Sequence, residues 1–470
     1  MNKNVKNYFL SNLAIKAIGL LTIPITTRFL SPADYGMVSI FTVYVGFASI
    51  ILPLNSYTSI GRYFFDKDVD FSKFVSTTVI VSFSSSIILA VFFFLIHQYL
   101  PTSKTFNLFF LFLIVINAIL TISSSIFMQI HEPANNSGLI LKRSIYSGIL
   151  SISINLIVII FAPAPKWQYV IYGSTFSILI INIYFFNSIK EYLSFSIEVS
   201  YLKYILGYSI PLLPYALSST ILSQIDRVMI GNNSGVSESG IYSFAITISM
   251  FIFFIGDSIN RAWTPTYFKF MENKNYLEHD LEISKNINLW CLFTIFFLFL
   301  YYEPSILLVG VKYHNALILV PIVVLGCLCE FCFTIYGRNI GYSKKTYFSS
   351  IILLLSGFLN IILNYYTLTD YGYKIAAINT VISYLFLFLM AYFVSRYIIK
   401  MHVYPILKLV RPFLIILLCV TFLYFFNLLK IVAFYSFLIK LFIFILLSLI
   451  FFKYDVLTFV NNTKKYLKIH

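Results

Sequence analysis

The sequence has few charged residues for its length. Only 11% of its 470 residues are Asp, Glu, Lys or Arg, whereas a typical soluble domain has about 25%. Hydrophobic residues make up 59% of the chain and the mean hydropathy is +0.87. One or two soluble cores cannot bury that much apolar surface. The chain is therefore predicted to be an integral membrane protein, with lipid as its solvent.

The sequence also lacks the patterns of a disulfide framework and of a metal centre. All five cysteines lie in apolar stretches, which argues against disulfides. Three of them crowd between residues 327 and 332, but on a helix they would not share one face, and no histidine is nearby. No metal site and no cofactor is predicted. The cysteines are Cys291, Cys327, Cys329, Cys332 and Cys419.

Signatures of catalysis and of nucleic-acid binding are missing as well. No metal motif, nucleophile triad or phosphate-binding glycine loop is present. The longest expected loop, about residues 263–286, holds only solvated charges and His279. A membrane polymerase or glycosyltransferase is therefore the weak alternative, and the protein is predicted not to be an enzyme. The net charge of +15 is scattered over short loops, which excludes a nucleic-acid-binding stripe.

What the sequence does have is long apolar segments. A membrane-spanning helix needs about 20 mostly apolar residues, and about fourteen such segments follow one another. The first, about residues 8–29, is too long for a signal-peptide core and carries Lys16, so we expect a retained helix. The predicted fold is all-α with about fourteen transmembrane helices. The segments start near residues 8, 37, 74, 105, 145, 167, 204, 240, 287, 315, 347, 376, 410 and 431.

The distribution of basic residues predicts the orientation. Of the 33 Lys and Arg residues, 24 fall in the loops and tails of one side and 6 on the other. Basic residues concentrate on the cytoplasmic side of membrane proteins. With fourteen spans both termini are therefore expected in the cytoplasm, and one miscounted helix would have disturbed the alternation.

Two parts of the chain resemble each other. Residues 59–62 (SIGR) match residues 258–261 (SINR), with an offset of 199. Residues 34–39 (DYGMVS) match residues 238–243 (ESGIYS), with an offset of 204. Such similarity predicts two repeats of six helices with the same topology. The expected domains are residues 1–203, residues 204–402, and an added helix pair with a cytoplasmic tail, residues 403–470.

Prolines stand at equivalent places in the two halves. Pro24 falls in the first expected helix, and Pro211 and Pro214 fall in the seventh. Paired, interrupted helices are the best sequence indication of a transporter's binding site. The chain is thus predicted to be a transporter.

The same windows resemble a known family. The stretch 27–36 (TRFLSPADYG) is similar to the helix 1–2 signature of the Wzx-type flippases of bacterial polysaccharide biosynthesis. Residues 202–214 (LKYILGYSIPLLP), 226–231 (DRVMIG) and 240–243 (GIYS) resemble the seventh and eighth helices of that family. Helix number and order extend the resemblance over the whole chain, while the motifs are confined to these windows.

The resemblance implies a fold and a function. The fold is that of the multidrug/oligosaccharidyl-lipid/polysaccharide (MOP) superfamily, with two six-helix bundles around a V-shaped central cavity. The function is alternating-access translocation of undecaprenyl-pyrophosphate-linked oligosaccharide across the bacterial inner membrane, for O-antigen, lipopolysaccharide or capsule synthesis. Implied partners are this glycan, membrane lipid, a polysaccharide polymerase and a chain-length regulator. A lipid II flippase and a cation-coupled multidrug antiporter of the same superfamily are the alternatives.

Five basic residues are candidates for contact with the pyrophosphate and sugar. Lys16 lies on a polar stripe of the first helix, where it either faces a cavity or extends to the cytoplasmic interface. Arg28 stands at the outer end of this helix. Arg62 and Arg261 occupy matching inner ends, as interfacial anchors or at the cytoplasmic mouth of the cavity. The fifth is Arg227, for which structural pairing across the bundles is favoured over substrate contact.

Three carboxylates inside expected spans are candidates for coupling to an H⁺ or Na⁺ gradient or for structural pairing. Asp226 lies on a polar face of the seventh helix. Asp257 precedes Arg261 by four residues, the favourable order for an intrahelical ion pair. Glu330 has no basic residue within a turn, and we expect it to be protonated or paired with a residue such as Lys16. The sequence does not choose among them, nor between a lipid-tail groove and a helix interface for Lys440.

Overall fold

The protein is all-helical in the part that the structure describes. This computed structural model describes residues 19, 22–66, 70–96, 105–194, 198–428 and 433–451, and none of them forms a strand. Eleven of the described helices are long and apolar enough to cross a membrane. The chain is therefore a multi-pass membrane protein. The expected total of fourteen spans stays a prediction, since most of the first lies outside the described residues.

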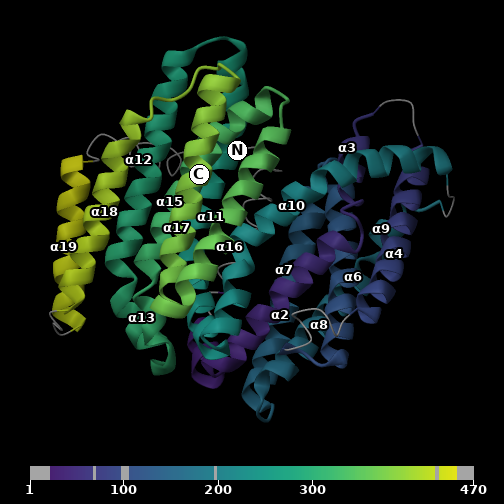
Figure 1. The fold of residues 1–470 in the computed structure, drawn as a ribbon, viewed down its shortest axis with the longest axis horizontal. Helices are drawn as coiled ribbons and strands as arrows, with labels where there is room; N and C mark the ends of the chain where they lie inside the picture. Colours follow the sequence, from purple (N-terminus) through teal and green to yellow (C-terminus); the bar gives the residue numbers. More distant parts are fainter. Residues whose placement is uncertain are drawn as a thin grey trace, which may run out of the picture. The chain divides into compact units, whose positions relative to one another are not determined.

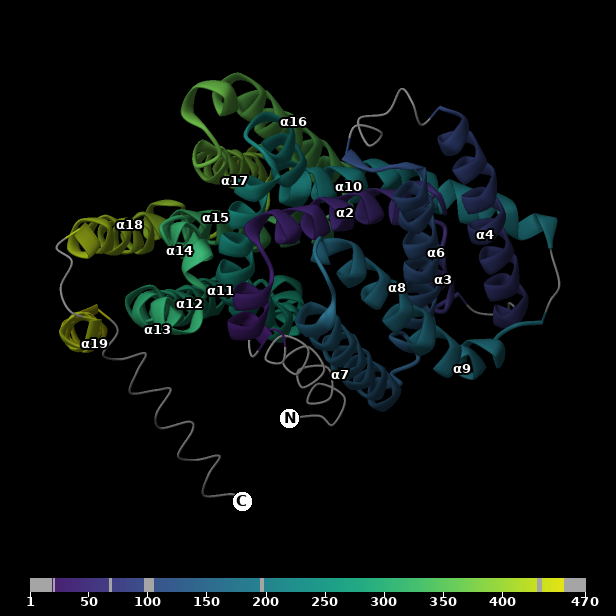
Figure 2. The same ribbon diagram turned by 90° about the horizontal axis from the view of Figure 1, so that it is seen from below.

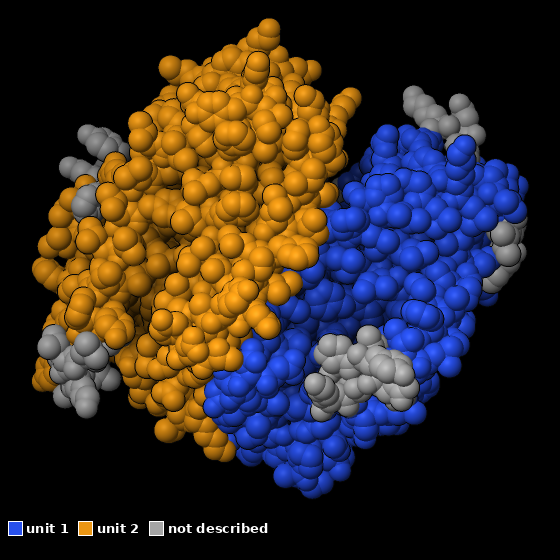
Figure 3. All heavy atoms as spheres, viewed as in Figure 1, with its two compact units in different colours: residues 1–240 blue, residues 241–470 orange. Residues whose placement is uncertain are grey.

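The chain divides into two compact units, residues 1–240 and residues 241–470, coloured separately in Figure 3. This division rests on internal contacts, so the domain boundaries expected from internal similarity, at residues 203 and 402, stay predictions. The helices of the first unit (unit 1) are α2 (Pro32–Ile51), α3 (Thr58–Tyr63), α4 (Phe71–Leu95), α6 (Leu108–His131), α7 (Ser137–Phe161), α8 (Lys166–Tyr184), α9 (Phe186–Lys190) and α10 (Val199–Asn233).

The second unit (unit 2) begins within α11 (Val236–Glu272). Its helices α12, α18 and α19 run side by side (Figure 1). Helix α15 packs along α17, as Figure 2 also shows. The elements that follow α11 in this unit are α12 (Tyr276–Leu300), α13 (Tyr302–Leu308), η2 (Val311–Tyr313), α14 (His314–Leu317), α15 (Val320–Tyr342), α16 (Tyr347–Tyr371), α17 (Ile375–Phe393), η3 (Val394–Ile398), α18 (Leu407–Leu428) and α19 (Ala433–Phe451).

Residues 31–34, which belong to the motif at 27–36, form the N-terminus of helix α2. Ser31 caps α2: its Oγ accepts a hydrogen bond from the Asp34 backbone N–H at 3.0 Å, and the Asp34 carboxylate accepts the Ser31 backbone N–H at 3.3 Å. Pro32 fits the first helical position because it needs no hydrogen-bond donor there. Asp34 also accepts the Trp167 backbone N–H at 3.2 Å, so this short motif ties α2 to the start of α8.

The two matched motifs meet at their glycines. A Cβ atom on Gly36 would collide with the backbone carbonyl of Val236, and one on Gly240 would collide with the carbonyl of Pro32. Only glycine allows two backbones to approach this closely. The glycine in residues 34–39 and the glycine in residues 238–243 therefore form one crossing between α2 and the first turns of α11.

Aromatic and amide side chains both form buried clusters between helices. Unit 1 contains an aromatic cluster in which Tyr63 stacks on Phe74 with 3.5 Å between ring centroids. Unit 2 contains a buried amide cluster: Asn379 Nδ2 donates to Asn364 Oδ1 at 2.8 Å, and Asn364 Nδ2 donates to Asn360 Oδ1 at 3.2 Å. Hydrogen bonds of this kind join α16 and α17 through side chains that are buried between the two helices.

The structure corrects the loop expected at residues 263–286. Helix α11 continues to Glu272 and α12 starts at Tyr276, so only residues 273–275 separate them. Asn275 accepts the Glu278 backbone N–H at 3.4 Å and so caps α12. The expectation failed because charged residues were taken to end a helix, whereas they extend these helices past their most apolar part.

The two halves are less alike than the motifs suggest. Residues 59–62 lie in the short helix α3, after a break in which Leu54 and Asn55 have positive φ angles. Residues 258–261 lie inside the uninterrupted helix α11. Likewise Pro211 and Pro214 lie within one continuous helix, α10, rather than at an interruption. The internal symmetry therefore stays a prediction.

Candidate functional site

A cavity lies among α11, α12 and α15 in unit 2. Its volume is about 190 Å³. Two of the candidate coupling carboxylates, Asp257 and Glu330, are among the residues that line it. The full lining is Phe253, Gly256, Asp257, Asn260, Trp290, Cys327, Glu330, Phe331 and Thr334.

One wall of the cavity is a flat aromatic surface. Trp290 of α12 stacks on Phe331 of α15, with 5.2 Å between centroids and 11° between planes. The indole can lie here because Gly256 of α11 has no side chain; a Cβ there would meet the Trp290 ring nitrogen. The three helices thus supply an apolar wall beside the two carboxylates.

Asp257 forms the predicted intrahelical pair with Arg261. Arg261 Nε lies 2.9 Å from Asp257 Oδ2, and the two side chains are 66% and 34% exposed, respectively. An exposed pair of this kind contributes at most about 1 kcal/mol. The pair therefore contributes little to the stability of α11.

Glu330 is the more unusual carboxylate. It projects from the middle of α15, a helix apolar enough to span the membrane. Within the described residues it accepts no hydrogen bond and forms no ion pair. An ionisable residue inside a membrane span indicates a functional site. Two carboxylates in one cavity also repel each other, and a bound proton or metal cation relieves this repulsion.

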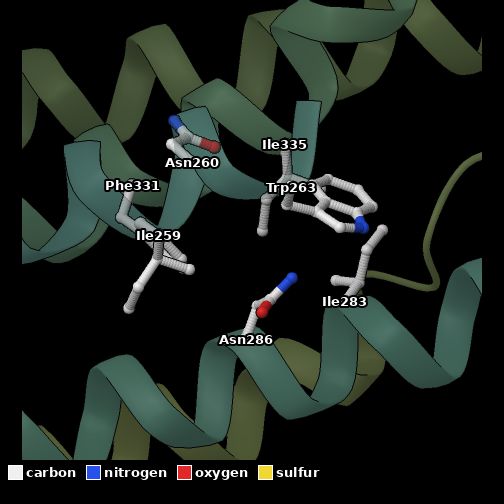
Figure 4. Close-up of a pocket in the computed structure, with 7 residues that line it drawn as sticks. All are labelled: Ile259, Asn260, Trp263, Ile283, Asn286, Phe331 and Ile335. Carbon is white, nitrogen blue, oxygen red and sulfur yellow. The ribbon is translucent and has the colours of Figure 1, made fainter. Parts of the chain in front are cut away.

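A second, smaller cavity adjoins the first, since Asn260 and Phe331 line both. Its volume is about 10 Å³, room for about one water molecule. Figure 4 shows the Asn286 amide nitrogen pointing into the group of lining side chains, opposite Asn260 and Trp263. Trp263 Nε1 and Asn286 Nδ2 are buried and have no hydrogen-bond partner among the described residues. Polar groups therefore extend from the carboxylate cavity toward the start of α12.

The other predicted site residues belong to unit 1. Arg28 and Arg62 are exposed, on the stretch before α2 and on α3 respectively. On α10, Asp226 is buried and Arg227 is half-buried. Lys16 lies outside the described residues. The structure thus groups Asp257, Arg261 and Glu330. In unit 1 it places Arg28, Arg62 and the adjacent residues Asp226 and Arg227 on three different segments.

A buried arginine of unit 1 was not among the predicted site residues. Arg143, which follows the exposed Lys142, is 6% exposed within α7. Its Nη2 donates to Asn182 Oδ1 at 2.7 Å and to Ser124 Oγ at 2.9 Å. The guanidinium also lies 4.3 Å from the centroid of the Phe127 ring. No sequence signal separates it from its exposed neighbour Lys142.

For Lys440 the structure decides between the two alternatives left open. Its Nζ donates to Glu303 Oε1 at 2.6 Å, and this carboxylate oxygen also accepts from Ser436. Lys440 is fully buried and Glu303 is 4% exposed. Lys440 therefore belongs to the interface between α13 and α19 rather than to a lipid-facing groove.

Comparison with known families now identifies the chain. The model of the polysaccharide biosynthesis protein family matches residues 25–318, well over half of the chain. The chain belongs to the polysaccharide biosynthesis protein family. This membership confirms the resemblance carried by residues 27–36, 202–214 and 226–231.

Individual relatives of this family member are distant in sequence. A protein of the Lsg locus of Haemophilus influenzae is 22% identical over 390 residues, which cover 74% of this chain and 88% of the relative. Among solved structures, the lipid II flippase MurJ in an inward closed conformation matches with a TM-score of 0.69 and 13% identity. That match covers 96% of this chain and 99% of MurJ.

An inward-facing multidrug resistance MATE transporter of the MOP superfamily also matches. The TM-score is 0.59 at 15% identity, over 85% of this chain and 98% of the transporter. At such low identities the likeness shows the fold alone. The family member therefore has a fold shared by MurJ and by MATE transporters, as the sequence resemblance implied.

Proposed function

We propose that the protein is a flippase that moves undecaprenyl-pyrophosphate-linked oligosaccharide repeat units across the bacterial inner membrane by alternating access. The observation that carries this proposal is membership of the polysaccharide biosynthesis protein family over residues 25–318. The match to a lipid II flippase over nearly the whole of both chains supports it. The product is a surface polysaccharide, O-antigen or capsule, with polymerase and chain-length regulator as downstream partners.

The physical task explains why basic residues are proposed to contact the substrate. A pyrophosphate and a polar glycan cross hydrocarbon only at a high cost in free energy. A hydrated V-shaped cavity lined by cations, open alternately to each side, lowers that cost. We assign this role to Lys16, Arg28, Arg62, Arg227 and Arg261. The excess of basic residues on one side supports an orientation with both termini in the cytoplasm.

The carboxylate cavity of unit 2 is proposed to bind the coupling cation, H⁺ or Na⁺. Asp257 and Glu330 line one cavity, and Glu330 has neither a hydrogen bond nor an ion pair within the described residues. Cation binding there also changes the charge next to Arg261, because Asp257 is its partner. Through this residue the cation can alter how unit 2 holds an anionic substrate.

Genetic complementation tests the flippase function. Deletion of the gene in its host is expected to abolish long-chain surface glycan and to leave single lipid-linked repeat units on the cytoplasmic side. The wild-type gene should restore the glycan, whereas Lys16→Ala, Arg62→Ala and Glu330→Gln should restore less than about a tenth of it, a barrier increase of about 1.4 kcal/mol or more. Lys269→Ala, an exposed cation on α11, is the matched control and should complement fully.

The same strains separate the alternatives. Normal surface glycan in the deletion strain, with altered resistance to cationic dyes, would favour a multidrug antiporter. Loss of peptidoglycan precursor export would favour a lipid II flippase. Accumulation of single repeat units on the periplasmic side would favour a polymerase, the enzyme alternative.

Transport in proteoliposomes tests the coupling assignment. An imposed proton or sodium gradient should accelerate flipping by the wild type, and Glu330→Gln and Asp257→Asn should remove the acceleration while leaving slow downhill flipping. Glu272→Gln, at the exposed end of α11, is the control and should respond like the wild type. Gradient acceleration that survives both cavity variants would contradict the assignment.

A further inference from the structure

Two histidines and an aspartate converge in unit 2, outside the lining of the carboxylate cavity. His279 and Asp280 lie in the first turns of α12, and His402 lies in the segment between η3 and α18. Asp280 Oδ1 is 3.1 Å from His279 Nδ1 and 2.9 Å from His402 Nε2. One potential ligand atom from each residue lies within 4.8 Å of the other two.

Aromatic rings hold the two imidazoles in place. The Tyr276 ring stacks on His402 with 4.5 Å between centroids. Trp263 and Tyr267 of α11 pack around His279 with centroid distances of 5.8 and 5.7 Å. The side chain of His279 is 2% exposed and that of His402 is 29% exposed. The cluster is therefore shielded on the α11 side and reachable from the side of His402.

Hydrogen bonds from α15 fix the segment that carries His402. Asn339 donates to the His402 carbonyl at 3.2 Å and is itself held by the Tyr267 hydroxyl at 2.6 Å. Tyr336 donates to the Tyr404 carbonyl at 3.0 Å. This support places His402 against α12 independently of any bound ion, which is the preorganisation that a metal site requires.

The atoms and their spacing suit a divalent transition metal. In a tetrahedral zinc site with bonds of about 2.0–2.1 Å, neighbouring ligand atoms are about 3.3 Å apart. The two distances from Asp280 Oδ1 are within about 0.4 Å of that value. A site with two imidazole nitrogens and one carboxylate oxygen binds Zn²⁺ in preference to Mg²⁺ or Ca²⁺, which favour oxygen ligands.

The buried histidine also lacks a full set of partners. His279 Nε2 is buried and has no hydrogen-bond partner among the described residues, so Asp280 is the polar group that its ring meets. The nitrogen that faces Asp280 is Nδ1, so a cation shared with Asp280 would be coordinated by Nδ1, and Nε2 would carry the ring proton.

We propose that His279, Asp280 and His402 bind one divalent transition-metal ion, best matched by Zn²⁺, with water in the remaining position. The ion would fasten residues 399–406, which connect η3 to α18, onto the start of α12. This inference does not rest on the proposed transport function. The proposed ion would link His402 to Asp280, two residues that are 122 positions apart in the sequence.

Metal titration of the full-length protein tests the proposal. The protein is purified in detergent without a histidine tag, stripped with a chelator, and titrated with Zn²⁺ and with Co²⁺. The wild type should bind about one ion per chain, show the intense visible bands of tetrahedral Co²⁺, and unfold at a higher temperature when Zn²⁺ is present. His402→Ala and Asp280→Asn should bind at least about 100-fold more weakly and lose both signals.

A matched histidine outside the cluster controls for nonspecific binding. His314, whose ring nitrogen lies 3.2 Å from the Val309 carbonyl, is changed to Ala and should leave binding unchanged. Gel filtration establishes that each variant is folded and monodisperse. A folded wild type that binds no Zn²⁺ or Co²⁺ would overturn the proposal. Undiminished binding by both His402→Ala and Asp280→Asn would overturn it too.

Discussion

Units 1 and 2 hold their buried basic side chains in different ways. In unit 1, neutral groups surround Arg143: the oxygens of Ser124 and Asn182 accept its hydrogen bonds, and an aromatic face lies beside it. In unit 2, the carboxylate of Glu303 lies 2.6 Å from the ammonium of Lys440. The site of Arg143 therefore keeps a net positive charge inside unit 1. In unit 2 the negative charge of Glu303 compensates the positive charge of Lys440.

This difference separates two kinds of stability. A guanidinium does not lose its proton in proteins, so Arg143 depends on the number and geometry of its hydrogen bonds. The Lys440–Glu303 pair depends on both partners being present, because either one alone is an uncompensated buried charge. Substitutions should therefore act cooperatively in the pair and individually at Arg143.

The largest effect is expected at the pair. Lys440→Met or Glu303→Gln should lower the free energy of unfolding by about 3–5 kcal/mol, since each leaves its partner without a counter-charge or with a mismatched one. The double variant should recover most of the loss. Equilibrium unfolding in mixed micelles and a double-mutant cycle measure this. Additive losses in the double variant would show that the two side chains do not act as a pair.

A smaller effect is expected at Arg143. Arg143→Met should cost about 1.5–3 kcal/mol, the range for hydrogen bonds to a charged group. Arg143→Lys should not restore stability, because an ammonium cannot reproduce the planar hydrogen bonds and the stacking on Phe127. The same unfolding measurement applies, with the exposed neighbour Lys142→Met as control. Full recovery with lysine would mean that charge alone matters there.

The smallest effect on stability is expected at Arg261. Its pair with Asp257 is largely exposed, so Arg261→Gln should change the free energy of unfolding by only about 0.3–0.5 kcal/mol. Flipping in proteoliposomes should nevertheless fall by about tenfold or more if this arginine contacts the substrate. Lys285→Gln, which also leaves an exposed intrahelical acid without its partner, is the control for stability. A stability loss comparable to that of Lys440→Met would make Arg261 a structural residue.

Much of the fold was predictable because each membrane helix corresponds to one continuous apolar segment of the sequence. Apolar segments predicted the all-helical class, and residues 27–36 predicted the family. The i, i+4 spacing predicted the Asp257–Arg261 pair, since both partners lie on one helix. Helix ends were less predictable: charged residues at 263–286 suggested a loop, yet α11 and α12 extend through most of it.

Contacts between distant helices escaped the sequence analysis. Arg143 follows Lys142 and looks like a loop cation, and only the packing of α6 and α8 shows that it is buried. Glu303 and Lys440 are 137 residues apart, and no local pattern joins them. The cluster of His279, Asp280 and His402 was hidden for the same reason, so no metal ligands were predicted. Lys16 lies outside the described residues, and its role stays a prediction.

Purified protein in proteoliposomes gives the most direct test of the central proposal. Undecaprenyl-pyrophosphate-linked repeat units are placed in both leaflets, and the fraction accessible to an added glycan-modifying enzyme is followed over time. With the wild type, accessible glycan should rise from the outer-leaflet fraction toward completion, while empty liposomes stay at the initial fraction. The account would be contradicted if the wild type also stayed at the initial fraction but transported cationic dyes.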